Sequence, residues 1–284
     1  MTILSIQSHV SYGYVGNRAA TFPLQSLGYD VWSVNTVNFS NHTGYGKWKG
    51  QILGPEAVRD VIQGILDLEA EDSCQAILSG YLGSAAIGNV IIETVNRFKT
   101  IKPDLIYMCD PVMGDVGRGF FVKDEVVDFF KKIGTHAASI ITPNHFEAEI
   151  LYGAKIKTLD DALKACQFFH DLGIKVATIT SLILDHTSAA TLHVLVSTPE
   201  QQLLGQTPYL PFTVAPNGTG DLFSALFLGH YLKTHDISLA LKQTLSSIFS
   251  VINRTFLSGN RELCLIAEDY KNPPLFDEIT VLQI

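Results

Sequence analysis

The sequence predicts an α/β protein of three layers, in which helices cover both faces of a central, mostly parallel β-sheet that has a small antiparallel portion. Short apolar runs rich in β-branched residues alternate with segments whose apolar residues recur at helical spacing, almost from end to end. This alternation is typical of β-α-β crossovers, which make strands parallel and place helices on both faces. The antiparallel portion is predicted where two strand-like runs are joined by a short turn containing Thr198-Pro199-Glu200.

The elements follow in order along the chain. Buried strands are predicted at 3–7, 31–34, 76–79, 105–108, 139–141 and 176–179, and helices at 57–68, 87–98, 126–133 and 162–172. The antiparallel pair is expected at 191–197 and 202–210, a buried helix from 222, a long helix at 239–256, and a surface-bound tail around Pro273-Pro274. Because no linker, composition shift or internal repeat interrupts this pattern, residues 1–284 are predicted to form a single domain.

Composition excludes several classes of protein. The net charge is −8 and the longest basic cluster is Lys131-Lys132, which argues against nucleic-acid binding. The sequence has no run of eighteen apolar residues and no basic region ahead of its first apolar stretch, so neither a membrane span nor a signal peptide is predicted. Its four cysteines are widely spaced without a CxxC pair, as expected of buried free thiols in a reducing cytoplasm. These features are typical of a cytoplasmic enzyme acting on small molecules.

A glycine-containing turn, Pro216–Asp221, opens the apolar run at 222–228. Gly218 and Gly220 are expected to adopt left-handed conformations, so that successive N–H groups converge on one anion. The helix that follows adds its partial positive charge. A phosphoryl group held there would lie beside Asp221, which could accept the proton of an attacking alcohol. The same residues also fit an ordinary Asn-Gly turn, with Asp221 as a favourable first-turn carboxylate.

Two further polar segments each follow a predicted strand. In the first, Asp110 and Asp115 could hold Mg²⁺ directly or through water. In the second, Pro143 can begin a helix on which Asn144 and Glu147 point to the same metal-phosphate site, although the two also fit a capping box. With the glycine turn, these segments supply an anion hole, a cation site and a base. Those are the parts that phosphoryl transfer needs.

The chain resembles the pyridoxal kinases of the ribokinase-like superfamily over about residues 3 to 232. It has no P-loop motif, and the spacing at 44–50 does not fit a dinucleotide fingerprint. The Gly-Thr-Gly-Asp motif marks the superfamily, whereas the Ser-His and Phe-Ser-Asn-His-Thr segments are specific to the pyridoxal branch. The resemblance lies in the segments 5–10, 13–20 and 38–45, followed in order by those around Asp110, Pro143 and Gly218.

The resemblance implies a ribokinase-like fold, a homodimer, and ATP-dependent phosphorylation of the 5′-hydroxymethyl group of pyridoxal, with pyridoxine and pyridoxamine as further acceptors, in vitamin B6 salvage. It implies Mg²⁺ or another divalent cation, with K⁺ or Na⁺ as a further ion. Asp221 would be the catalytic base, and Gly218, Thr219 and Gly220 the anion hole. Ser8 would hydrogen-bond the pyridine ring and Thr43 would seat the vitamin, in a pocket lined by Val37, Phe39, His42, Gly44 and Tyr81. The nucleotide would meet Asp110, Thr142, Asn144, Glu147, Thr180 and Ser181, and the metal would meet Asp110, Asp115, Thr142 and Glu147.

Three points stay open at this level. Some family members carry lysine where Thr180 stands, so a charged contact to ATP is absent here. Residues 116–121 fit either a mobile flap over the phosphates or a solvated loop. The alternative functions are a hydroxymethylpyrimidine kinase, which acts on a similar flat heteroaromatic alcohol, and a non-catalytic carrier of pyridoxal phosphate.

Overall fold

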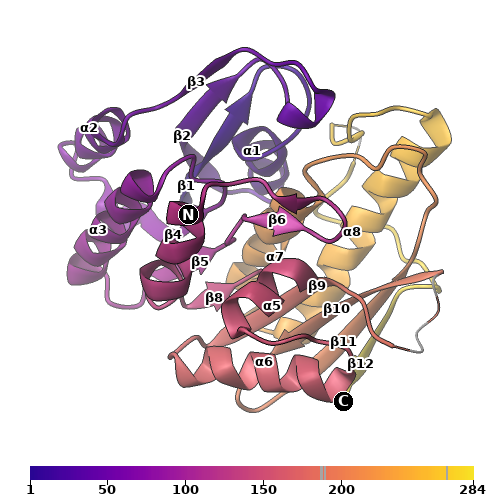
Figure 1. The fold of residues 1–284 in the computed structure, drawn as a ribbon. Coiled ribbons are helices and arrows are strands. Elements are labelled where there is room, and N and C mark those ends of the chain that lie inside the picture. Colours follow the sequence, from indigo (N-terminus) through magenta and orange to yellow (C-terminus); the bar gives the residue numbers. More distant parts are fainter. Residues whose placement is uncertain (186–187, 189, 267) are drawn as a thin grey trace.

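A computed structural model describes residues 1–185, 188, 190–266 and 268–284. Its main sheet has ten strands, of which the central ones are parallel and those toward the two edges are antiparallel (Figure 1). This arrangement confirms the predicted fold class. The strands lie in the order β12 (Thr280–Gln283), β11 (Gln202–Pro208), β10 (Thr191–Ser197), β9 (Val176–Leu182), β8 (Ile140–Ile141), β5 (Ile106–Cys109), β4 (Cys74–Ser79), β1 (Thr2–Val10), β2 (Asp30–Phe39) and β3 (Gly50–Ile52).

Helices cover both faces of the sheet because neighbouring residues of a strand point to opposite faces. In β1, Leu4 packs into one apolar core and Ile3 into the other, and in β8 Ile141 and Ile140 divide in the same way. The core on the Leu4 face is covered by α2 (Pro55–Leu66), α3 (Ala85–Ile101), α4 (Asp124–Phe129), α5 (His145–Tyr152) and α6 (Leu159–Asp171). The core on the Ile3 face is covered by α1 (Asn17–Ser26), α7 (Thr219–Thr234) and α8 (Ile237–Ser258).

The connectivity places the ends of several strands at one edge. Strand β1 pairs in parallel with β2 on one side and with β4 on the other, so the order of the strands reverses at β1. Strands β4, β5, β8 and β9 continue in parallel. In open α/β sheets, ligands bind beyond the carboxyl ends of the strands next to such a reversal.

Among the described residues, α1 is the one long helix that the sequence pattern did not predict. Its first residue, Asn17, is buried, accepts a hydrogen bond from Ser5 Oγ (2.8 Å) and donates to the Val34 carbonyl (3.0 Å). These bonds fix the start of α1 against β1 and β2. Because Pro23 lies inside the helix and cannot donate a backbone hydrogen bond, tertiary contacts override the local tendency here.

The structure also departs from the sequence prediction in smaller ways. The segment at 126–133 forms α4 followed by a π-helical turn, Phe130–Gly134, and the C-terminal tail ends in β12 at the sheet edge. A separate hairpin, β6 (Gly114–Asp115) and β7 (Gly119–Phe120), and two short 3-10 helices, η1 (Thr43–Tyr45) and η2 (Glu71–Ser73), complete the elements. All four cysteines are free thiols. No helix in the described ranges is long and apolar enough to cross a membrane.

Candidate active site

A cavity of about 250 Å³ opens at the carboxyl ends of the parallel strands. It brings together residues that β1, β2, β4, β5, β8 and β9 carry at or just beyond their ends, and the start of α7. Of the predicted site residues, Gly44 alone does not line it. The predicted residues that do are Ser8, Val37, Phe39, His42, Thr43, Tyr81, Asp110, Asp115, Thr142, Asn144, Glu147, Thr180, Ser181, Gly218, Thr219, Gly220 and Asp221.

The glycine turn begins α7 with Gly218 as the N-cap residue, at φ +90°. A Cβ atom on Gly218 would lie 1.9 Å from the Tyr14 carbonyl oxygen, so both the conformation and the close approach require glycine. The prediction for Gly220 was wrong. Gly220 lies in the first turn of α7 without a positive φ, because the helix has already begun at Thr219. One left-handed residue therefore begins α7 at the cavity, which Gly218, Thr219 and Gly220 line.

Besides Asp115, three carboxyl groups line the same cavity, those of Asp110, Glu147 and Asp221. Burial raises the pKa of Asp221, against a hydrogen bond from the Gly16 backbone N–H. Burial, followed by the negative charges of Glu147 and Asp221, raises the pKa of Asp110 well above its usual range. None of the ion pairs in the described part of the chain includes any of the three. Together they favour a bound cation.

The donor set fits Mg²⁺ held jointly with a ligand, rather than a site made by protein alone. No group of three His, Cys, Asp or Glu side chains within the described residues is arranged to hold a metal by itself. Mg²⁺ commonly binds one or two carboxylates, substrate phosphates and water, so a partial set is what it requires. Asp110 and Asp115 supply the carboxylate oxygens that suit this ion. Thr142 instead shares a hydrogen bond with Ser224 (2.8 Å), and Ser224 Oγ donates to Asp110 (3.1 Å).

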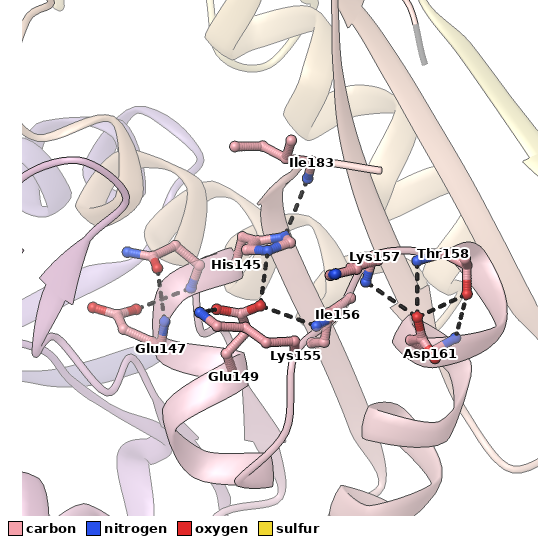
Figure 2. A network of polar contacts seen from close by, with 10 residues as sticks. His145, Glu147, Glu149, Lys155, Ile156, Lys157, Thr158, Asp161 and Ile183 are labelled. Carbon is pink, nitrogen blue, oxygen red and sulfur yellow. Dashed lines mark hydrogen bonds and ion pairs between the residues drawn. The ribbon is translucent and has the colours of Figure 1, made fainter. Parts of the chain in front are cut away.

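Glu147 holds backbone groups of two segments beside the cavity in place. Its carboxylate accepts hydrogen bonds from the backbone N–H groups of Met113 (2.8 Å), Gly114 (3.3 Å) and Asn144 (2.9 Å). Asn144 accepts in return from the Glu147 N–H, which completes the capping box at the start of α5 (Figure 2). Pro143 was expected to begin this helix, but it precedes the cap, since Asn144 takes the N-cap position. The capping-box interpretation therefore holds, and the same bonds position the β5–β6 segment.

The start of α5 is held from its other side as well. His145 Nδ1 accepts a hydrogen bond from the Ile183 N–H (3.2 Å), and His145 Nε2 lies 3.5 Å from Glu149 Oε1 (Figure 2). The other oxygen of Glu149 forms an ion pair with Lys155 Nζ at 2.7 Å. Burial lowers the pKa of His145, which keeps its ring neutral and able to accept. This network ties α5 to the end of β9, where Thr180 and Ser181 reach the cavity.

The opposite wall of the cavity is aromatic and hydroxyl-bearing. Ser8 packs closely against Gly16, and Tyr81 follows the end of β4. Phe39 packs on Trp48 with ring centroids 4.2 Å apart. His42 caps η1 by accepting from the Gly44 N–H (3.1 Å), and burial, followed by the nearby Arg118 charge, lowers its pKa. This wall suits a flat aromatic ligand that needs stacking and a few polar contacts.

The β6–β7 hairpin forms part of the mouth of the cavity. Arg118 at its tip donates to Asn217 (3.3 Å), and the guanidinium carbon lies 4.8 Å from the centroid of the Phe121 ring. Asp115, Arg118 and Phe121 all line the cavity. Of residues 116–121, the structure places Arg118 and Phe121 in the wall of the cavity.

A second pocket of about 200 Å³ adjoins the first, and sequence reasoning missed it. Thr180, Ser181, Pro216, Thr219 and Gly220 line both. Ser181 has φ +49°, a strained conformation for a residue with a side chain, at the point where the register between β9 and β10 shifts. The remaining walls are mostly apolar and come from distant parts of the chain, among them Leu192, Tyr209, Phe212, Phe223, Ile248 and Ile252.

Glu147 gives a pH-dependent prediction for the ligand-free protein. Burial raises its pKa from 4.5 to about 7, so between these values the folded state binds a proton that the unfolded state has released. The free energy of unfolding should therefore fall as pH rises from about 4.5 to about 7, by roughly 3 kcal/mol from this group. Urea titrations in chelator at several pH values check this. A Glu147→Gln variant that keeps the full slope would contradict it.

The geometry combines a ribokinase-like sheet with a helix N-terminus, an acidic residue in its first turn and an adjoining apolar pocket. This combination defines a small-molecule kinase. The family model of phosphomethylpyrimidine kinase matches residues 35–263. The chain is 45% identical over 278 residues to pyridoxal kinase PdxY of Rubrobacter xylanophilus, covering 97% of this chain and 95% of the relative.

Two further comparisons agree. Pyridoxal kinase PdxY of Corynebacterium diphtheriae is 43% identical, covering 94% of this chain and 93% of the relative. The structure of pyridoxal kinase from Leishmania donovani in complex with ADP and pyridoxamine superposes with a TM-score of 0.91 at 31% identity, covering 100% of this chain and 99% of that one. The chain belongs to the pyridoxal kinase family.

Proposed function

We propose that this enzyme transfers the γ-phosphoryl group of ATP to the 5′-hydroxymethyl group of pyridoxal, giving pyridoxal 5′-phosphate and ADP. The observation that carries the proposal is that one cavity holds the aromatic wall, the N-terminus of α7 and Asp221. An acceptor on that wall would present its hydroxyl to a phosphoryl group at the helix start. Pyridoxine and pyridoxamine share the same hydroxymethyl group and are further acceptors.

Asp221 is the catalytic base in this proposal. As the new oxygen–phosphorus bond forms and the bond to ADP breaks, the hydroxyl proton passes to its carboxylate. The alcohol is too weak an acid to ionise beforehand, so a base placed in the transition state is needed. Burial raises the pKa of Asp221, which makes its carboxylate a better proton acceptor than an exposed one. The N–H groups at Gly218, Thr219 and Gly220 lower the energy of the charged phosphoryl oxygens.

Asp110 and Asp115 hold Mg²⁺ in this proposal, directly or through water, and Glu147 and Thr142 position them or share the water. Bound there, the ion neutralises phosphate charge. Asn144 fixes the Gly114 carbonyl (2.8 Å) and so the start of the hairpin. A monovalent ion, K⁺ or Na⁺, would assist at the phosphates.

Removal of divalent cations is therefore expected to lower the phosphorylation rate by at least about a hundredfold, because the charges of the carboxylates and phosphates then repel one another. The rate measured with chelator present, and again after Mg²⁺ is added in excess, checks this. Undiminished turnover in chelator would contradict the assignment.

The second pocket is proposed to hold the purine base of ATP. It is apolar, and it meets the first at Thr180, Ser181 and Thr219, where the triphosphate would pass. Thr180 and Ser181 offer hydroxyl groups there. This joined pair of pockets favours a kinase over a carrier of pyridoxal phosphate, since a carrier needs no purine site.

On the vitamin side, Ser8 is proposed to hydrogen-bond the pyridine ring and Thr43 to seat its substituents. Val37, Phe39 and Tyr81 contact the ring face. His42 uses one ring nitrogen to accept from Gly44, so its other nitrogen is free to donate to the acceptor. Gly44 contributes through the backbone of η1 and not as a lining residue.

A second candidate function is hydroxymethylpyrimidine kinase, because the matching family model is named for a kinase of a related pyrimidine, phosphomethylpyrimidine. Steady-state assays with pyridoxal, pyridoxine, pyridoxamine, hydroxymethylpyrimidine and ribose as acceptors separate the two. The proposal predicts the highest kcat/KM with a B6 vitamer. A higher value with hydroxymethylpyrimidine would overturn it, and binding of pyridoxal phosphate without any ATP-dependent product would favour the carrier.

We also propose that residues 1–284 form one functional domain. The protein is proposed to act in the cytoplasm as a homodimer. The ten-stranded sheet uses residues from both ends of the chain, which supports a single unit. Light scattering coupled to size exclusion is expected to give twice the 31.1 kDa mass of the chain at micromolar concentration. A mass of one chain across that range would contradict the dimer.

A further inference from the structure

The loop that follows α8, residues 259–266, lies beside η1, although more than 200 residues separate them (Figure 1, yellow and purple). Leu263 and Leu265 anchor the loop, each only 1% exposed in the core. Arg261 and Glu262 precede these anchors, and both contact η1, Arg261 at the Gly44 carbonyl and Glu262 at the Tyr45 hydroxyl. The anchored loop thus presents a cation and an anion to η1.

The Glu262 carboxylate joins two segments. One oxygen accepts from the Tyr14 N–H at 3.0 Å, and the other accepts from the Tyr45 hydroxyl. Gly13 makes room for this contact: it has φ +91°, and a Cβ atom on it would lie 2.2 Å from Glu262 Oε2. The Tyr45 pKa is raised by burial and by its bond to Glu262, which keeps the hydroxyl protonated as the donor.

Arg261 holds the same short helix from outside. Its guanidinium donates to the Gly44 carbonyl (3.1 Å), and its central carbon lies 3.6 Å from the centroid of the Tyr45 ring. Arg261 and Glu262 therefore contact consecutive residues of η1, whose neighbours His42 and Thr43 line the cavity. Hydrogen bonds to charged groups are among the stronger ones in proteins.

The second hydrogen-bond partner of Glu262, Tyr14, lies next to the anion hole. Tyr14 donates its N–H to Glu262, and its carbonyl oxygen lies against Gly218 of the anion hole. A single carboxylate thus connects the η1 segment to the turn that contacts the start of α7. No other acidic side chain in the described residues is hydrogen-bonded to both segments.

We propose that Glu262, together with Arg261, is a positioning residue that holds η1 at the mouth of the acceptor pocket. This inference rests on the proposed function. If the binding-competent position of η1 loses its support, the apparent affinity for pyridoxal falls by the fraction of molecules that leave it. The proposed nucleotide pocket does not include η1, so loss of the η1 contact alone leaves the affinity for ATP unchanged.

The test compares Tyr45→Phe, Glu262→Gln and the double variant, with Glu278→Gln as the matched control because Glu278 is exposed and lines neither of the two pockets described above. Calorimetry gives the Kd of pyridoxal without ATP, and kinetics give KM for pyridoxal and for ATP. Each single variant is expected to raise the Kd and KM for pyridoxal about tenfold, the effect of one lost hydrogen bond to a charged group. The double variant should add little to the larger single effect, since both remove the same contact.

KM for ATP and the melting temperature are expected to stay near the wild-type values in Tyr45→Phe. An unchanged Kd for pyridoxal in Tyr45→Phe would overturn the inference, as would an equal rise in KM for ATP, which indicates a merely structural role. If Glu262→Gln folds poorly, Tyr45→Phe decides alone, because it removes only a hydroxyl group. Wild-type protein that neither binds nor phosphorylates pyridoxal would overturn the proposed function itself, and so is distinguishable from failure of the positioning role.

Discussion

Replacing Asp221 with asparagine is expected to lower kcat by about two to four orders of magnitude, the usual range for loss of a general base. The side chain keeps its size and its place in the first turn of α7, so binding of ATP and pyridoxal should change little. Steady-state kinetics with saturating substrates measure the effect. The account requires the loss to appear in kcat and not in KM.

The melting temperature provides the control for this variant. Burial raises the pKa of Asp221, which means that its charge is costly in the folded state. The neutral amide should therefore leave the melting temperature unchanged or raise it. An Asp221→Asn enzyme that folds and keeps wild-type turnover would remove Asp221 from the mechanism.

Replacing Gly218 with alanine is expected to produce the second large effect, on both activity and stability. Its φ of +90° disfavours any side chain, and the added Cβ would lie 1.9 Å from the Tyr14 carbonyl oxygen. Strain alone costs about 1–2 kcal/mol, and backbone must also move to relieve the overlap. Because that backbone forms the anion hole, kcat/KM should fall by at least about a hundredfold.

Gly28→Ala is the matched control. Gly28 has φ +94°, close to that of Gly218, but no atom lies within 4 Å of its added Cβ, and it lines neither pocket. This variant should lose about 1–2 kcal/mol of stability from strain and keep its activity. Equal activity losses in the two variants would show that the Gly218 effect is not local to the anion hole.

The sequence was sufficient for the centre of the fold because the central strands are apolar on both faces. Runs such as Ala76–Ser79 and Val176–Ile179 can be buried only between two layers of helices. The three-layer arrangement could therefore be predicted from these strands. The edges were less predictable. Strands β3 and β12 are short and mostly exposed, and α1 contains Pro23, so their local patterns are weak and tertiary contacts decide them.

The candidate site was predictable where its residues are contiguous. The segments around Asp110, Asn144 and Gly218 each follow a strand or begin a helix, and the cavity contains all three. Local reasoning failed at Gly220, because it could not place the first residue of α7. It also missed the second pocket and the Glu262 contact, which join residues far apart in sequence and depend on α8 packing beside the sheet.

The most direct test of the central claim is detection of pyridoxal 5′-phosphate formed from pyridoxal and ATP. Purified enzyme with Mg²⁺ and K⁺ is incubated with both substrates, and the product is identified by mass spectrometry alongside the Asp221→Asn variant. The account predicts one equivalent of pyridoxal 5′-phosphate per ADP with the wild type and almost none with the variant. ADP release without phosphorylated pyridoxal, or equal product from both proteins, would contradict it.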